Sequence, residues 1–176
     1  MIVSVGIDPG LNGAVVVINM ALQLLDWYDC PTIELKKGKR TNRQFAVAEM
    51  TRILKTILEA HGHHHMQLFL EKAGAQPKQG LASTFKTGYG FGLWEGMLPW
   101  TGKPYAVIHP NKWTRTVLKG LPPGDPKERS MINCQRLFPD LPLVKPRGKV
   151  LSLDGRADAA NVAYYGLMHE MVKPTI

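Results

Sequence analysis

The sequence has few cysteines and no long hydrophobic run. Its 176 residues include two cysteines, Cys30 and Cys134, without metal-ligand spacing, and so few thiols in a chain of this length favour free, reduced cysteines. The longest uncharged apolar stretch, Ala14 to Leu25, is interrupted by polar amides and is too short to span a bilayer. Because Asp8 breaks the N-terminal apolar segment, a signal peptide is also not expected. We therefore expect a cytoplasmic protein with no membrane partner.

Acidic residues are scarce compared with basic ones. The chain has 14 Asp and Glu against 22 Lys and Arg, which gives a net charge of +8 and a pI near 9.6. Such a balance favours a polyanionic partner. Hydrophobic residues make up 44% of the chain and the mean hydropathy is -0.14, as in soluble globular proteins. The length suits one domain covering residues 1–176.

The hydrophobic pattern predicts a mixed α/β protein. Strands are expected at Ile2 to Asp8, Ala14 to Asn19, Leu22 to Asp29, Gln67 to Lys72 and around residues 103–110. Helices are expected around residues 47–59, 81–100, 111–118, 126–138 and 154–171. Three strands in a meander, followed by strands separated by helices, predict a five-stranded mixed sheet with helices on both faces. A basic loop is expected from Lys36 to Arg43.

The stretch "GIDPGLNGA", Gly6 to Ala14, has two interpretations. Pro-Gly and Asn-Gly between two apolar runs are ordinary turn residues, so Asp8 could simply belong to a turn. A carboxylate at the end of a buried strand is also a suitable ligand for a divalent cation. This motif alone does not distinguish the two.

Three further acids occupy similar positions. Glu71 ends the apolar strand "QLFL", where an ion pair with Lys72 is the alternative to a functional role. Asp154 and Asp158 are four residues apart, so a helix would present both on one face, although Asp154 could instead cap that helix. Four converging carboxylates would repel one another without cations. The set therefore predicts catalysis and metal binding by Asp8, Glu71, Asp154 and Asp158, with two Mg²⁺ ions about 4 Å apart.

Three segments together resemble a known family. "GIDPGLNGA", "LEKAGAQPKQGLASTFKTGYGFGLWEGML" and "DGRADAANVAYYG" are similar, in this order, to the RuvC family of Holliday-junction resolvases, particularly its bacteriophage versions. The resemblance implies a ribonuclease-H-like fold, a homodimer and paired nicking of four-way DNA in recombination and repair. It also implies dependence on Mg²⁺ or Mn²⁺, no organic cofactor, and products with a 5′-phosphate and a 3′-hydroxyl. Asp8, Glu71 and Asp158 match the metal-binding acids of the family.

The sequence departs from the bacterial pattern at one position. An acid or a histidine is expected three residues before the last aspartate, and Gly155 stands there. Asp154, one residue earlier, is the natural substitute as fourth ligand.

Several basic and polar residues near these acids are candidates for contacts with DNA. Lys78, Gln79, Ser83, Thr84 and Lys86 surround the start of a helix, whose N-terminus can accept a phosphate, and Phe85 could wedge against an unstacked base. Lys145, Arg147, Lys149 and Arg156 flank the last acids, whereas Lys112 and Arg115 are weaker candidates. The alternative for each charged stretch is a solvated surface. The basic loop either touches the DNA arms or is solvated, and the histidines of "HGHHHM" are interpreted as a helix end.

Three other functions are compatible with parts of the pattern. A ribonuclease H acting on RNA–DNA hybrids would use a similar acidic cluster, and a catalytically inactive junction-binding module would keep the basic surface. A sugar-kinase or actin-like ATPase also has Gly-Ile-Asp-x-Gly after its first strand. That fold needs a duplicated domain, for which 176 residues leave no room.

Overall fold

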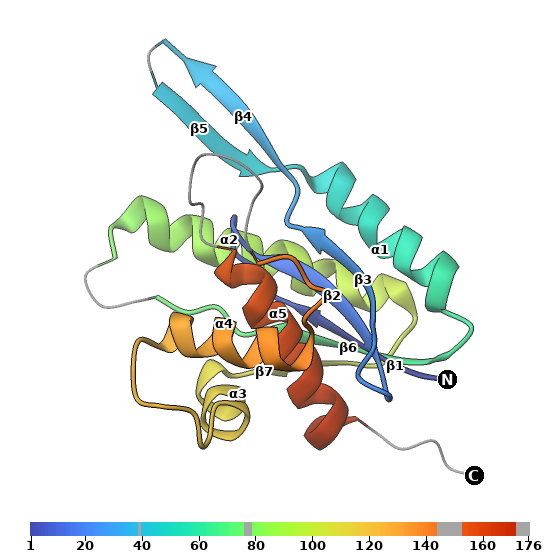
Figure 1. Cartoon of the computed structure of the whole chain (residues 1–176). Helices are drawn as coiled ribbons and strands as arrows, with labels where there is room; N and C mark the ends of the chain where they lie inside the picture. The colour runs from blue at the N-terminus through green and yellow to red at the C-terminus, as the bar shows by residue number, and fades with distance from the viewer. Residues whose placement is uncertain (39, 76–78, 144–152, 172–176) are drawn as a thin grey trace.

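A five-stranded mixed sheet forms the centre of the molecule. The computed structural model describes residues 1–38, 40–75, 79–143 and 153–171. The strand order is β3-β2-β1-β6-β7, with the bounds β1 (Ile2–Ile7), β2 (Ala14–Asn19), β3 (Leu24–Asp29), β6 (His65–Glu71) and β7 (Tyr105–Ile108). β2 is antiparallel to both β1 and β3, whereas β1, β6 and β7 run parallel (Figure 1). The predicted mixed five-stranded sheet is confirmed.

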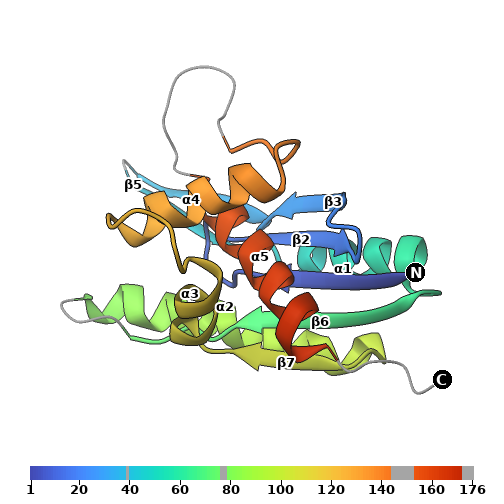
Figure 2. The same cartoon turned by 60° about the horizontal axis from the view of Figure 1, so that its bottom comes forward.

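Helices cover both faces of this sheet, as the sequence predicts (Figure 2). α1 (Val47–His61) and α2 (Leu81–Met97) pack on one face; α3 (Pro110–Val117), α4 (Pro126–Leu137) and α5 (Asp154–Tyr165) cover the other. Alternation along the strands supplies both cores, because successive strand side chains point to opposite faces. In β2, Val15 and Val17 join the core under α1 and α2, whereas Val16 and Ile18 pack against α4 and α5.

Helix α5 lies unusually close to the central strand. A Cβ atom on Gly6 of β1 would lie 2.1 Å from the main-chain oxygen of Ala159, so only glycine permits this approach. Ser4 Oγ also donates a 2.7 Å hydrogen bond to the Ala163 oxygen. The face of α5 toward the sheet carries small buried side chains, Ala157, Ala159, Ala160 and Ala163. This contact brings the start of α5 to the end of β1.

The predicted basic loop is instead part of a β-hairpin, so that prediction is wrong. β4 (Thr32–Lys37) and β5 (Arg40–Phe45) pair antiparallel as a separate two-stranded sheet. The hairpin extends away from the main sheet (Figure 1). Ile33 and Leu35 alternate in β4 but are about half exposed, whereas β5 is polar apart from Phe45 and has no apolar alternation to identify it.

Two further helical segments extend α2 and α5 to about their predicted ends at residues 100 and 171. α2 continues into a 3₁₀ turn, η1 (Leu98–Thr101), and α5 continues into a π-helical segment, η2 (Gly166–Glu170). Cys30 and Cys134 are free thiols buried in different cores, as expected. Within the described residues, no helix has both the length and the apolar character needed to cross a membrane.

Candidate active site

The four predicted acids line one cleft. β1 and β6 are parallel neighbours with Ile7 opposite Leu70, so Asp8 and Glu71 stand side by side at the carboxyl ends of the two strands. Asp154 is the first residue of α5 and Asp158 lies one turn later. All four border a cleft of about 540 Å³. The sheet and the close approach of α5 therefore bring together residues from both ends of the chain.

Burial and mutual repulsion disfavour the charged forms of three of these carboxylates. Burial, together with the neighbouring charges of Asp8 and Asp158, raises the pKa of Glu71 to about 8. Burial and the charge of Asp8 likewise raise the pKa of Asp158 to about 7. The pKa of Asp8 rises to about 6, again mainly through burial, and the amide of Gly10 opposes this rise. A bound divalent cation would relieve this repulsion.

Each carboxylate already has a protein partner. Asp8 Oδ1 accepts from the Gly10 amide at 2.9 Å, and Glu71 Oε1 accepts from Trp113 Nε1 at 2.8 Å. Asp154 Oδ2 pairs with Lys127 Nζ at 2.5 Å, and Asp158 Oδ1 accepts from Ser130 Oγ at 2.5 Å. Glu71 therefore accepts a hydrogen bond from the indole of Trp113. The ion pair with Lys72 that was considered as an alternative does not form among the described residues.

The donor set fits a hard divalent cation in its chemistry. All four side chains offer carboxylate oxygens, the ligands that Mg²⁺ uses, and they surround one hollow. As these side chains now lie, no three His, Cys, Asp or Glu residues in the described parts of the chain are close enough to hold a metal ion. The ammonium of Lys127 supplies positive charge beside Asp154 instead.

The structure gives a physical reason for Gly155, which stands where the family pattern has an acid or a histidine. A Cβ atom on Gly155 would lie 2.1 Å from the main-chain oxygen of Asn12, in the loop that follows β1. Any side chain at position 155 would push α5 away from this loop. Asp154 lies on the adjacent position, lines the cleft and avoids the clash.

Sequence reasoning missed three residues that contact the acids. Lys127 and Ser130 lie one turn apart on α4 and contact Asp154 and Asp158. Trp113 of α3 holds Glu71. Asp125 caps α4 through the amides of Lys127 and Glu128, and an Asp-Pro pair is a readable helix start. Nothing in the sequence spacing indicates which face of α4 meets α5.

Part of the predicted DNA-binding set borders the same cleft. Gln79, Ser83 and Lys86 line it together with Thr87, which the sequence did not single out. Gln79 Nε2 donates to Ser83 Oγ and to Thr87 Oγ1, both at 3.0 Å, and Lys86 Nζ donates to Asn42 Oδ1 on the hairpin at 2.6 Å. The first turn of α2 thus forms one wall of the cleft.

The other predicted DNA contacts have different positions. Thr84 lies half-buried in the first turn of α2, and Phe85 is 73% exposed and stacked on Tyr89. Lys112 and Arg115 are exposed on α3, and Lys112 Nζ lies 3.7 Å from Glu170 Oε1. The remaining four, Lys78, Lys145, Arg147 and Lys149, lie outside the described residues.

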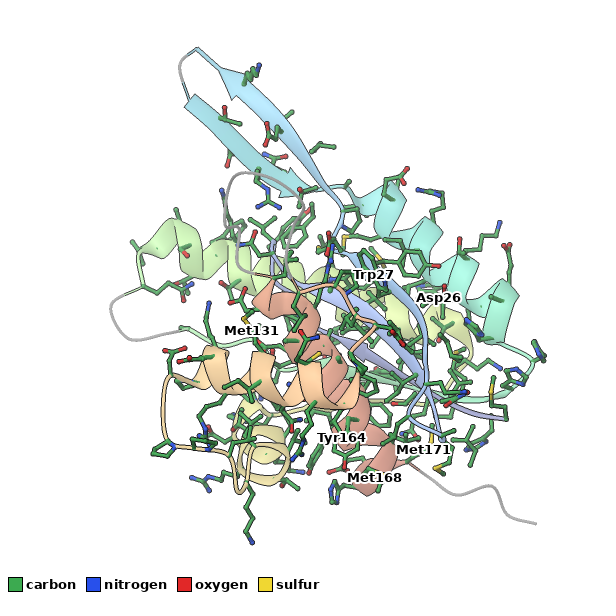
Figure 3. All side chains as sticks on the ribbon, viewed as in Figure 1. Asp26, Trp27, Met131, Tyr164, Met168 and Met171 are labelled. Atoms are coloured by element: carbon green, nitrogen blue, oxygen red, sulfur yellow. The ribbon has the colours of Figure 1, made fainter. Side chains whose placement is uncertain are left out.

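Arg156 does not take the predicted position on the DNA-facing surface. Its side chain is 8% exposed, and its Nε and Nη2 atoms donate to both oxygens of Asp29 at 2.6 and 2.7 Å. Nη1 donates to the Pro142 oxygen, and the guanidinium carbon lies 3.8 Å from the ring centre of Trp27, which is labelled in Figure 3. Arg156 therefore fastens α5 to β3, and its donors are used within the fold.

Two other basic features connect parts of the framework. Arg43 of β5 donates to Asn12 Oδ1 at 2.7 Å and to the Leu11 oxygen at 2.9 Å, so it ties the hairpin to the loop carrying Gly10 to Gly13. His61 Nε2 lies 2.6 Å from Asp26 Oδ2, which joins the end of α1 to β3 (Figure 3). The predicted helix end in "HGHHHM" is confirmed by this position of His61.

Comparisons with solved structures show a likeness in fold. No protein-family model and no curated protein matches the sequence. The fold is similar to T. thermophilus RuvC in complex with a Holliday-junction substrate, with a TM-score of 0.64, 19% identity, and coverage of 97% of this chain and 94% of that one. A second structure, Thermus thermophilus RuvC, matches with a TM-score of 0.52, 18% identity, and coverage of 94% and 96%. The chain therefore has the ribonuclease-H-like fold of RuvC.

Proposed function

We propose that residues 1–176 form one nuclease domain that resolves Holliday junctions and cuts other branched DNA. The observation that carries this proposal is the convergence of Asp8, Glu71, Asp154 and Asp158 on one cleft in a basic protein with the fold of RuvC. The proposed reaction is phosphodiester hydrolysis that leaves a 5′-phosphate and a 3′-hydroxyl. Action in the cytoplasm is part of the proposal, and the resemblance to the bacteriophage versions of the family remains a prediction.

Asp8, Glu71 and Asp158 would hold two Mg²⁺ or Mn²⁺ ions, with Asp154 as the fourth ligand. Bound there, such ions activate the attacking water and stabilise the leaving oxygen. The protein itself orients the ligands: the Gly10 amide, Trp113 and Ser130 each fix one carboxylate oxygen. Lys127 contacts Asp154 and would be free to meet a phosphate once that carboxylate binds a cation.

DNA would be held mainly through its phosphates. The side chains of Gln79, Ser83 and Lys86 border the cleft where a scissile phosphate must enter, and Thr84 lies in the same helical turn. Phe85 exposes its ring beside them and would stack on an unpaired base. Lys78, Lys112, Arg115, Lys145, Arg147 and Lys149 are the further proposed contacts of the DNA backbone.

A homodimer is proposed because α2 exposes an apolar face. Tyr89 is 48% exposed and Trp100, just beyond the helix, is 91% exposed. Gly88, Gly92 and Gly96 recur on the same side, and Cβ atoms at these positions would meet nothing within 4 Å. Such a face allows the backbone of a second α2 to approach closely. Two copies would present two clefts for the paired nicks.

Cleavage of labelled four-way junction, fork and RNA–DNA hybrid side by side, with and without Mg²⁺, tests the proposed function. We expect paired, Mg²⁺-dependent nicks in the junction and no cutting of the hybrid. Preferential cutting of the hybrid would indicate a ribonuclease H. Tight binding of the junction without cutting in either Mg²⁺ or Mn²⁺ would indicate an inactive junction-binding module.

A further inference from the structure

A buried polar network connects α4 and α5 behind Asp158. Ser130 and Asn133 of α4 and Asn161 of α5 are 1%, 0% and 0% exposed. Each helix contributes residues three positions apart, so Ser130 meets Asp158 and Asn133 meets Asn161 as two adjacent contacts between the helices. Met131 of α4 and Tyr164 of α5, which are labelled in Figure 3, pack against the apolar core that these two helices share with β2.

The direction of every hydrogen bond in this network is fixed. Arg136 has only donors, and its Nη2 lies 3.2 Å from Asn133 Oδ1. The amide of Asn133 must then donate to Asn161 Oδ1, at 2.7 Å. Consequently the two amide hydrogens of Asn161 are directed at Ser130, one to its main-chain oxygen at 3.0 Å and one to its hydroxyl oxygen at 2.9 Å.

The hydroxyl of Ser130 is left with a single choice. Its oxygen already accepts from Asn161, so its only hydrogen is donated to Asp158 Oδ1 at 2.5 Å. The hydrogen bonds therefore run in one direction, from Arg136 through both asparagines and the serine to the carboxylate, and aligned bonds of this kind strengthen one another.

We propose that Asn161 is a positioning residue that acts through Ser130 to hold the Asp158 carboxylate by Oδ1, so that Oδ2 is presented to the cleft as the metal ligand. This inference rests on the proposed function, because it gives Asp158 the role of a ligand. Groups that hydrogen-bond a metal ligand orient it, and their loss commonly weakens metal affinity about 10-fold or more.

The network is more than a means of stabilising the fold. A buried polar cluster that only joined two helices could be replaced by well-packed apolar side chains at little cost. Here, however, all donors point to one end, and that end is a carboxylate lining the cleft. Ser4 provides the contrast: its buried hydroxyl also contacts α5, but it donates to the main-chain oxygen of Ala163 and reaches no carboxylate.

The test is Mn²⁺ affinity of the full chain without DNA, measured by titration calorimetry or by the electron paramagnetic resonance signal of free Mn²⁺. Ser130→Ala removes the hydroxyl that contacts Asp158, and we expect about 10-fold weaker Mn²⁺ binding. Ser4→Ala makes the same truncation at an equally buried site and should leave the Mn²⁺ affinity unchanged. Junction affinity in EDTA should be equal in both variants, whereas the Mn²⁺ concentration for half-maximal cleavage should rise only in Ser130→Ala.

Asn161→Leu tests the step from Asn161 to Ser130. It removes both donors at similar side-chain volume, and we expect weaker Mn²⁺ binding in the wild-type background but no additional loss in the Ser130→Ala background. If melting curves show that the leucine variant is unfolded, Asn161→Ala removes the same donors and replaces it. A wild-type Mn²⁺ affinity in the Asn161 variant would overturn its assignment as a positioning residue.

The two proposals can fail separately. If Ser130→Ala weakens Mn²⁺ binding but the parent chain cuts no junction, the positioning inference stands and the proposed function is wrong. If the parent cuts junctions and Ser130→Ala binds Mn²⁺ as well as Ser4→Ala, the proposed function stands and the inference is wrong. A parent chain that binds no Mn²⁺ overturns both.

Discussion

Gly155, at the start of α5, lies directly against the main chain of Asn12: a Cβ atom there would be 2.1 Å from the Asn12 oxygen. Gly155→Ala should therefore lower the free energy of unfolding by about 2 kcal/mol or more, since overpacking a tight site costs about 1–3 kcal/mol. Gly155→Asp, which restores the acid of the family pattern, should be at least as damaging. Chemical denaturation measures both.

Gly124→Ala is the control for these variants, because a Cβ at that exposed position would meet nothing within 4 Å. It should leave stability close to that of the parent. An equally harmless Gly155→Ala would mean that α5 and the Gly10 to Gly13 loop are not packed as described.

Asp8→Asn and Glu71→Gln should each reduce junction cleavage to background while preserving or tightening junction binding. Each substitution keeps the side-chain shape, removes a carboxylate ligand, and lowers the negative charge that repels DNA. Cleavage and gel-shift assays on one labelled junction separate the two effects. Glu59→Gln, an exposed acid on α1, should change neither. Wild-type cleavage rates in either cleft variant would refute the metal assignment.

The metal-free protein should lose stability as pH rises from about 4 to 8. Folding raises the pKa of Asp8 to about 6, of Asp158 to about 7 and of Glu71 to about 8. Between the ordinary carboxyl pKa near 4 and these values the folded state binds more protons than the unfolded state, so the free energy of unfolding falls with increasing pH.

Melting temperatures in EDTA across this pH range measure the effect, and added Mn²⁺ should offset it most at high pH. Glu71→Gln should flatten the decline above pH 7, because the most strongly raised pKa is removed. A melting temperature in EDTA that rises between pH 6 and 8 would contradict the burial and mutual repulsion of the three carboxylates in the cleft.

Arg156→Met should destabilise the fold without changing how junction binding depends on salt. The substitution removes a paired guanidinium and its contact with Trp27, at a cost of about 1–3 kcal/mol. By contrast, replacing Lys145, Arg147 and Lys149 together with alanine should reduce the slope of log affinity against log salt. A protein that makes fewer phosphate contacts releases fewer counterions when it binds. Equal slopes for the triple variant and the parent would remove that segment from the interface.

Gly92→Glu should prevent dimerisation and leave the monomer folded. A Cβ at Gly92 meets nothing within 4 Å in the isolated chain, so the substitution is harmless unless another molecule packs there. Sedimentation velocity should show a dimer for the parent and a monomer for the variant. Gly124→Glu adds the same charge in an exposed loop and should stay dimeric. A dimeric Gly92→Glu would place the two-fold contact elsewhere.

The sheet, its helices and the four acids of the cleft were predictable because each has a local signature. Apolar alternation identifies β1 and a continuous apolar run identifies β2, and an acid at the end of an apolar strand stands out in Asp8 and Glu71. The resemblance to the RuvC family adds the prediction that these acids act together. Each of these features is set by residues close together in the sequence, so the sequence pattern itself reveals it.

The residues that were missed depend on contacts between distant segments. Arg156 was predicted as a DNA contact because arginine is usually a surface cation. Its actual partner, Asp29, is 127 positions away in the sequence. Lys127 and Ser130 are ordinary helix-surface residues until α4 is placed against α5. The β4–β5 hairpin was missed for a different reason: β5 is polar apart from Phe45 and lacks the apolar alternation on which strand prediction depends.

The contact of α5 with Gly6 also determines when during folding the protein acquires its chemistry. The acids come from positions 8, 71, 154 and 158, so the cleft is complete only after a late segment of the chain returns to its first strand. Contacts between residues so far apart in sequence form slowly. A nascent or partly folded chain therefore has its basic segments but no assembled cleft, and under the proposed function the ability to cut DNA would report complete folding.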